Sequence, residues 1–246
     1  MAVVAAIALM SAASAAFGGS IVNSKHNISS TGEASIKGGA TDSSQICIYC
    51  HAPHNANLAL PLWNRTNPAA NTFTLYSGIN MQSRQFATGF TSDSTSLFCM
   101  SCHDGATNMN AVSNQGALER GNQAGKTAPG DAGFPLVNAI ITDTNLEFGS
   151  NLSKTHPINF PVPTTPQNNQ DDLWLGAGSS MGGGTALPTT FPLFNTKADP
   201  GMSAQRTSNG RSLECGSCHA VHDSTISPFL RFTMSGSKLC LGCHNK

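Results

Sequence analysis

Charged residues are scarce in this sequence. They make up 11% of its 246 residues, and 13 basic side chains balance 13 acidic ones, whereas about 25% of the residues of an average soluble protein are charged. No run of basic residues appears along the chain, and a basic patch is the electrostatic footprint of a nucleic-acid-binding protein. The charge pattern therefore argues against a nucleic-acid partner.

Long apolar runs are also absent after the first residues of the chain. The run over 1–17, MAVVAAIALMSAASAAF, is shorter than the roughly 20 apolar residues that a membrane-spanning helix needs. It ends in small residues with an A-x-A match at Ala13 to Ala15, which is typical of the core and cleavage site of a signal peptide. We therefore predict a signal peptide over residues 1–16, one exported domain over 17–246, and no transmembrane span.

Bulky side chains for a core are few. Apolar residues make up 39% of the chain and aromatic residues 7%, while Ser, Thr, Asn and Gly are plentiful. Burial of apolar surface is the main favourable term in folding, so such a chain would not build a large aliphatic core unaided. Another source of apolar bulk is expected.

Cysteine is absent outside one repeated pattern, Cys-x-x-Cys-His, which is the attachment motif of a c-type haem. Two thioether bonds hold the vinyl edge of the porphyrin, and the adjacent histidine is then placed beneath the iron as its proximal ligand. We number the four copies in chain order as sites one to four: Cys47, Cys50 and His51; Cys99, Cys102 and His103; Cys215, Cys218 and His219; Cys240, Cys243 and His244.

Other uses of a Cys-x-x-Cys pair do not account for the histidines. Such pairs bind zinc, form redox disulfides or bridge exported proteins, and none of these uses requires a histidine after every pair. At the histidine frequency of this chain, four coincidences would arise roughly once in a million. We therefore predict four covalently attached haem c groups.

Four further histidines match the four irons in number. The chain has eight histidines, and those outside the attachment motifs are His26, His54, His156 and His222. The even match predicts bis-histidine ligation at every haem. Methionine is the rival sixth ligand and raises the reduction potential. Met100 lies within the attachment loop of site two and cannot reach the far face of that haem, whereas these methionines stay open as alternatives: Met81, Met109, Met181, Met202 and Met234.

The expected fold is a mostly irregular multihaem cytochrome, with minor β-structure and a core built on four stacked haems. Helices should be few and short, mainly one turn around each attachment motif. The sequence over 137–148 predicts a strand or short hairpin, that over 154–160 an extended segment, and the Gly- and Pro-rich run over 176–200 an irregular loop. Aromatic residues between sites one and two are expected to pack as core against the haems: Trp63, Phe73, Tyr76, Phe86 and Phe90.

These residues resemble a known family. The segment from Cys215 to His244, with CHxxH, a Leu-Arg pair and LCxxCH, resembles the doubled CXXCH motif of multihaem cytochromes. The whole mature chain is similar to the OmcE-type tetrahaem cytochromes that polymerise into extracellular filaments, through GGSIVNSKHN, QICIYCHAPHN and SKTHPINFPV. The resemblance implies a filament subunit with a continuous stack of haems, which passes through the periplasm to the cell surface.

His54 raises a separate question, because it follows its own proximal ligand His51 by only three residues and cannot reach over that haem. His222 is nearest in sequence to site four. If His222 serves site four, and His26 and His156 serve sites one and two, only the iron of site three still lacks a sixth ligand. That leaves His54 for site three, at the opposite end of the chain. The resemblance implies that such a histidine ligates a haem of the neighbouring subunit. We therefore predict a head-to-tail homopolymer in which His54 crosses the interface, with His26 as the next candidate.

The predicted function follows from the expected ligation of each iron by two histidines. A bis-histidine haem has no open position for a substrate, so outer-sphere electron transfer remains, and no catalytic residues are expected. We predict an electron conduit to other cytochromes or extracellular acceptors. Two alternatives stay open: a reductase of small nitrogen or sulfur oxyanions, which would need a five-coordinate haem, and a monomeric periplasmic shuttle with the same haems.

Overall fold

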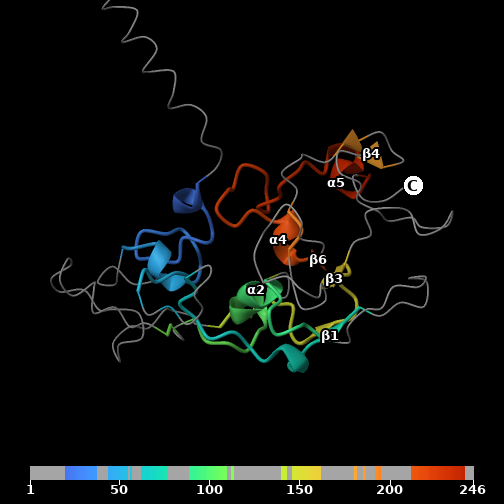
Figure 1. The fold of residues 1–246 in the computed structure, drawn as a ribbon. Helices are drawn as coiled ribbons and strands as arrows, with labels where there is room; N and C mark the ends of the chain where they lie inside the picture. Colours follow the sequence, from blue (N-terminus) through green and yellow to red (C-terminus); the bar gives the residue numbers. More distant parts are fainter. Residues whose placement is uncertain are drawn as a thin grey trace, which may run out of the picture.

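The computed structural model describes residues 20–37, 44–54, 56, 62–76, 89–109, 112–113, 140–142, 146–161, 180–181, 185–186, 192–194 and 212–241. The predicted signal peptide over 1–16 lies outside these ranges. Within them the chain is mostly loop, with short helices and two-residue strands (Figure 1), as predicted. None of the helices in these ranges has both the length and the apolar character needed to cross a membrane.

Helical turns coincide with the attachment motifs. η2 covers Cys47–Tyr49, α2 covers Ser96–His103, α4 covers Cys215–Cys218 and α5 covers Lys238–Leu241. Residues three apart lie on the same face of a helix, so one turn brings both cysteines of a motif to one side. Within the described residues, the remaining helical elements are single 3-10 turns: η1 at Ile21–Asn23, η3 at Ala70–Thr72 and η4 at Ser235–Ser237.

Two pairs of short strands join distant parts of the chain. β1 (Thr74–Leu75) pairs in parallel with β2 (Asn151–Leu152), and β3 (Phe160–Pro161) pairs antiparallel with β6 (Ser212–Leu213). β4 (Ser180–Met181) and β5 (Thr185–Ala186) form a third, antiparallel pair. The prediction of an extended segment over 154–160 is confirmed at its end, where β3 begins. The prediction of an irregular loop over 176–200 is wrong at β4 and β5, because this run doubles back on itself. The described parts of 137–148 contain no strand.

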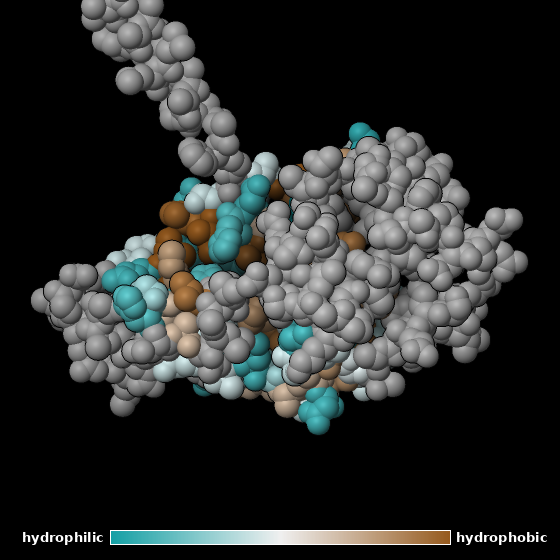
Figure 2. Space-filling view, viewed as in Figure 1, coloured by the Kyte–Doolittle hydropathy of each residue, from teal (hydrophilic) through white to brown (hydrophobic). Residues whose placement is uncertain are grey.

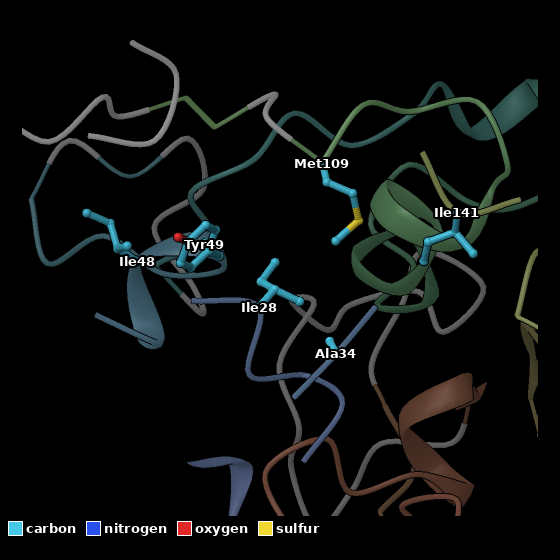
Figure 3. Packing of buried hydrophobic residues seen from close by; sticks show 6 residues of the cluster. All are labelled: Ile28, Ala34, Ile48, Tyr49, Met109 and Ile141. Atoms are coloured by element: carbon cyan, nitrogen blue, oxygen red, sulfur yellow. The ribbon is translucent and has the colours of Figure 1, made fainter. Parts of the chain in front are cut away.

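Two small clusters of buried side chains form the core of the described residues. The first gathers around site one, and Figure 3 shows its members: Ile28, Ala34, Ile48, Tyr49, Met109 and Ile141. The second joins β1 and β2 to α2: Phe73, Leu75, Phe90, Leu97, Met100 and Leu152. Met100 therefore belongs to the core. Of the predicted core aromatics, Trp63 is also buried, its ring centroid 4.9 Å from that of Phe98, and Phe86 lies outside the described ranges.

The N-terminal segment packs on a segment near the C-terminus. The Ser224 hydroxyl donates to the Ser20 carbonyl oxygen at 3.3 Å, across 204 residues of sequence. The ring of His26 stacks on Phe229 with centroids 4.4 Å apart, and its Nδ1 lies 3.5 Å from the Val221 carbonyl oxygen. The two ends of the described chain therefore meet, and they meet at a candidate ligand.

Candidate haem-attachment centre

Each described attachment motif is closed by its own backbone. The amides of Cys50 and His51 both donate to the carbonyl of Cys47, at 3.1 and 2.8 Å. At site three the amide of His219 donates to the carbonyl of Cys215 at 3.0 Å. Each turn holds two thiols and the following imidazole in one local unit, which is what two thioether bonds to one porphyrin require.

Each attachment motif lies close in space to the motif that follows it in the sequence. Burial raises the pKa of the Cys50 thiol to about 12, and Cys102 of site two adds to this rise. Interaction with Cys215 of site three is the main cause of the raised pKa of Cys99 in site two. Burial, Cys215 and Cys240 of site four raise the pKa of Cys218 to about 11. Figure 1 shows the same order, from the light blue turn of site one through α2 and α4 to α5.

Two pairs of histidine rings lie at a separation that would suit one shared iron. An imidazole nitrogen lies about 2 Å from the metal that it ligates, and the ring centroid about 1 Å further out. Two rings on opposite sides of one metal therefore have centroids about 6 Å apart. The rings of His26 and His103 are 6.2 Å apart, and those of His51 and His222 are 6.0 Å apart.

The second nitrogen of several rings is already occupied by the backbone. A carbonyl oxygen only accepts, so the Nδ1 atoms that face one must carry the proton. This places Nδ1–H of His103 on the Leu146 carbonyl at 2.7 Å and that of His219 on the Pro228 carbonyl at 2.9 Å. His156 makes the same contact with Pro157 at 2.8 Å. Metal-ligating histidines are held in this way, with the other nitrogen directed at the metal.

Exposed apolar residues lie next to two of these rings, those of His103 and His26. The ring centroid of Phe148 lies 5.8 Å from that of His103, and Phe148 is 48% exposed. Leu146 and Val221, whose carbonyls face His103 and His26, are also exposed, and Figure 2 shows apolar atoms at the surface between polar ones. A porphyrin needs such surroundings. The thiols, the imidazole nitrogens and the apolar side chains thus fit haem c, which would supply one-electron redox chemistry at these positions.

The ring positions differ from the assignment made by sequence order. His222 lies beside His51 of site one, although it is nearest in sequence to site four. His26 lies beside His103 of site two. His54 is exposed, three residues after His51. Cys243 and His244 of site four lie outside the described ranges, as do Met81 and Met202.

Sequence reasoning missed two buried polar residues, Asn64 and Arg65, that join sites one and two. The Asn64 amide donates to the Cys50 carbonyl at 2.9 Å, and its side chain donates to the Ile48 carbonyl at 2.7 Å. Arg65 has no solvent exposure, and its guanidinium donates to the carbonyls of Ser101, Asn108 and Met109 at 2.7 to 3.1 Å. No motif marks Arg65, because its partners are backbone atoms that any residue provides.

Arg65→Met is expected to lower the free energy of unfolding of the haem-loaded protein by about 3 kcal/mol or more, because each buried acceptor left without a donor costs about 1–3 kcal/mol. Denaturant unfolding followed by circular dichroism measures the loss. Lys37→Met is the matched control: Lys37 also donates to a carbonyl, that of Gly32, but it is exposed. The free energy of unfolding of the Lys37→Met variant should fall by no more than about 0.5 kcal/mol. Equal losses in the two variants would contradict the role of Arg65.

Comparison with known proteins gives one family match. The family described as the doubled CXXCH motif matches residues 209–246, which contain sites three and four. Among curated proteins, none matches this sequence. A doubled CXXCH motif indicates covalently bound haem c, and it supports a multihaem c-type cytochrome.

Proposed function

We propose that this protein carries electrons through four bis-histidine haems and is the subunit of an extracellular filament. The observation that supports it best is the pair of ring separations, 6.2 Å and 6.0 Å, each between a proximal histidine and a spare one. A haem held between two such histidines would have no open position for a substrate. The residues then hold the haems in place and exclude water, and the protein is not an enzyme.

The two ring pairs limit which histidines remain as sixth ligands for sites three and four. His222 would serve site one and His26 site two, which leaves His54 and His156 for sites three and four. His156 lies four residues before β3, and β3 pairs with β6 directly before site three. We assign His156 to site three on this ground.

His54 then remains for site four. Site one, which His54 follows, stands at one end of the order of sites, and site four stands at the other. A histidine at the first end reaches site four of the next subunit in a head-to-tail array. Heterologous contacts that do not close give open filaments. The resemblance to filament-forming cytochromes implies the same arrangement.

The spin state of the irons and the size of the exported particle test this proposal. Four low-spin haems are expected in electron paramagnetic resonance, and a substantial high-spin signal in the native protein would favour the oxyanion reductase. Negative-stain microscopy of the protein shed from cells should show filaments. Monomers under all conditions would favour the periplasmic shuttle.

His222→Ala is expected to make one of the four haems high-spin, because the iron of site one loses its sixth ligand. The matched control repeats the substitution in a chain that lacks the haem of site one through Cys47→Ser and Cys50→Ser. There His222→Ala should add no high-spin signal. A signal that persists in this background would mean that His222 serves another site.

His156→Met should raise the reduction potential of one haem and leave those of the other three unchanged, since thioether ligation favours ferrous iron.

A further inference from the structure

A buried carboxyl group lies between sites two and three. Glu214 has no solvent exposure, and neither has Ser96 or Ser212. Its Oε2 accepts from the hydroxyl of Ser94 at 2.6 Å, from the hydroxyl of Ser96, and from the Ser96 amide at 3.3 Å. Its Oε1 accepts from the Ser212 hydroxyl at 2.9 Å, and the Ser217 amide caps the same side chain. We call Glu214 with Ser94, Ser96 and Ser212 the serine cage.

The serine cage connects two haem-attachment motifs directly. Ser96 begins α2, which carries both cysteines of site two, and Glu214 is the N-cap of α4, which carries those of site three. The amide of Cys215 donates to the Ser96 hydroxyl at 3.0 Å, and the thiols of Cys99 and Cys215 are close enough to shift each other's pKa. The carboxyl group is therefore within the contact between the two motifs.

The groups around this carboxyl suit two protonation states. Burying a charge is costly without a counter-charge, and the described donors to Glu214 are all neutral. Burial raises the pKa of Glu214, and the hydrogen bonds from Ser94, Ser96 and Ser212 oppose that rise. A hydroxyl both donates and accepts, so the serines can turn to serve a carboxylate or a carboxylic acid. The titratable groups that face Glu214 from α2 and α4 are Cys99 and Cys215, which hold no proton once they are thioethers.

We propose that Glu214 takes up a proton when the haem at site two or three is reduced and releases it on reoxidation. A haem held at site two or three would supply the one-electron change: an electron from a neighbouring haem would lower the local charge by one. A hydronium ion of the solvent then gives its proton to the Glu214 carboxylate. One O–H bond of the hydronium breaks, one O–H bond forms on the carboxyl group, a water molecule remains, and the local charge is restored. This inference rests on the proposed function only in requiring redox-active haems at these two sites.

The test is a spectroelectrochemical titration of the haem-loaded protein at a series of pH values. Proton uptake becomes less favourable as the pH rises, so the potentials of two haems should fall. The limit is a tenfold change in the reduction equilibrium per pH unit, about 59 mV for one electron. Glu214→Gln should remove this dependence, because an amide takes no proton, and Glu214→Asp should retain part of it.

Glu33→Gln is the control for loss of one negative charge. Glu33 is exposed, where solvent screens its charge, so the pH dependence should stay as in the native protein. A Glu214→Gln protein whose potentials keep the native pH dependence would overturn the proposal. Should Glu214→Gln not fold, infrared difference spectra of the native protein decide: reduction must produce the carbonyl band of a protonated carboxyl group, and its absence overturns the proposal.

The two proposals fail separately. Low-spin haems with potentials that do not depend on pH would overturn the role of Glu214 and leave electron conduction standing. High-spin iron at site four, or monomers in place of filaments, would overturn the proposed filament and leave the pH dependence of sites two and three unaffected.

Discussion

A chain with all eight attachment cysteines replaced by serine is expected to be largely unfolded. Its described helices have eight residues or fewer, and its described strands have two residues each. Isolated helices shorter than about 12 residues are marginal in water, and two-stranded pairs need further packing to be stable. Because the binding free energy of the cofactor is folding free energy in such a protein, far-ultraviolet circular dichroism should show a disordered chain without a cooperative thermal transition.

Variants that each lose one haem should differ in how much stability they lose. Cys50 of site one and Cys102 of site two pack against the same hydrophobic cluster, and the Cys215 amide of site three donates to the hydroxyl of Ser96, which begins the helix of site two. Loss of the haem at site two should therefore destabilise the protein more than loss of the haem at site four, where Cys240 is exposed. A native-like spectrum from the cysteine-free chain would contradict the expectation.

His54→Ala is expected to abolish filaments and leave one high-spin haem in a soluble subunit. On our assignment, His54 supplies the sixth ligand of site four in the next subunit, so one substitution removes both the ligand and the link between subunits. Negative-stain microscopy and electron paramagnetic resonance measure the two effects in the same preparation.

His156→Ala separates ligation from assembly. It should also leave one high-spin haem, since His156 is assigned to site three of its own chain, but filaments should still form. Added imidazole should restore low-spin iron in the His54→Ala protein without restoring filaments, because a free ligand joins nothing. A His54→Ala protein that loses a ligand and still polymerises would show that His54 serves a haem of its own chain.

Local features of this structure follow from the sequence, and long-range pairings do not. The Cys-x-x-Cys-His spacing predicts a helical turn at each motif, because three-residue spacing defines one helical face, and the scarcity of apolar residues predicts a loop-rich chain. The partner of His51 could not be predicted in this way. His222 is near site four in sequence, and only the path of the whole chain brings it to site one.

Buried polar groups escape sequence reasoning for a related reason. Glu214 precedes an attachment motif and looks like an ordinary helix cap, and its serine partners Ser94 and Ser96 lie about 120 residues earlier. Arg65 binds backbone carbonyls, which leave no trace in the sequence. Both become visible only when the two segments that each one joins are placed side by side.

The contact between residues 20–26 and 221–229 has a consequence for folding during synthesis. It forms only after the residues between these two segments have been made, and contacts of such large sequence separation form slowly. On the proposed pairing, the same delay applies to site one, whose ligand His222 is made long after His51. A chain synthesised only as far as residue 221 would therefore hold a haem with one open coordination position at site one. Under the proposed export, quality control in the receiving compartment would have this reactive species to recognise.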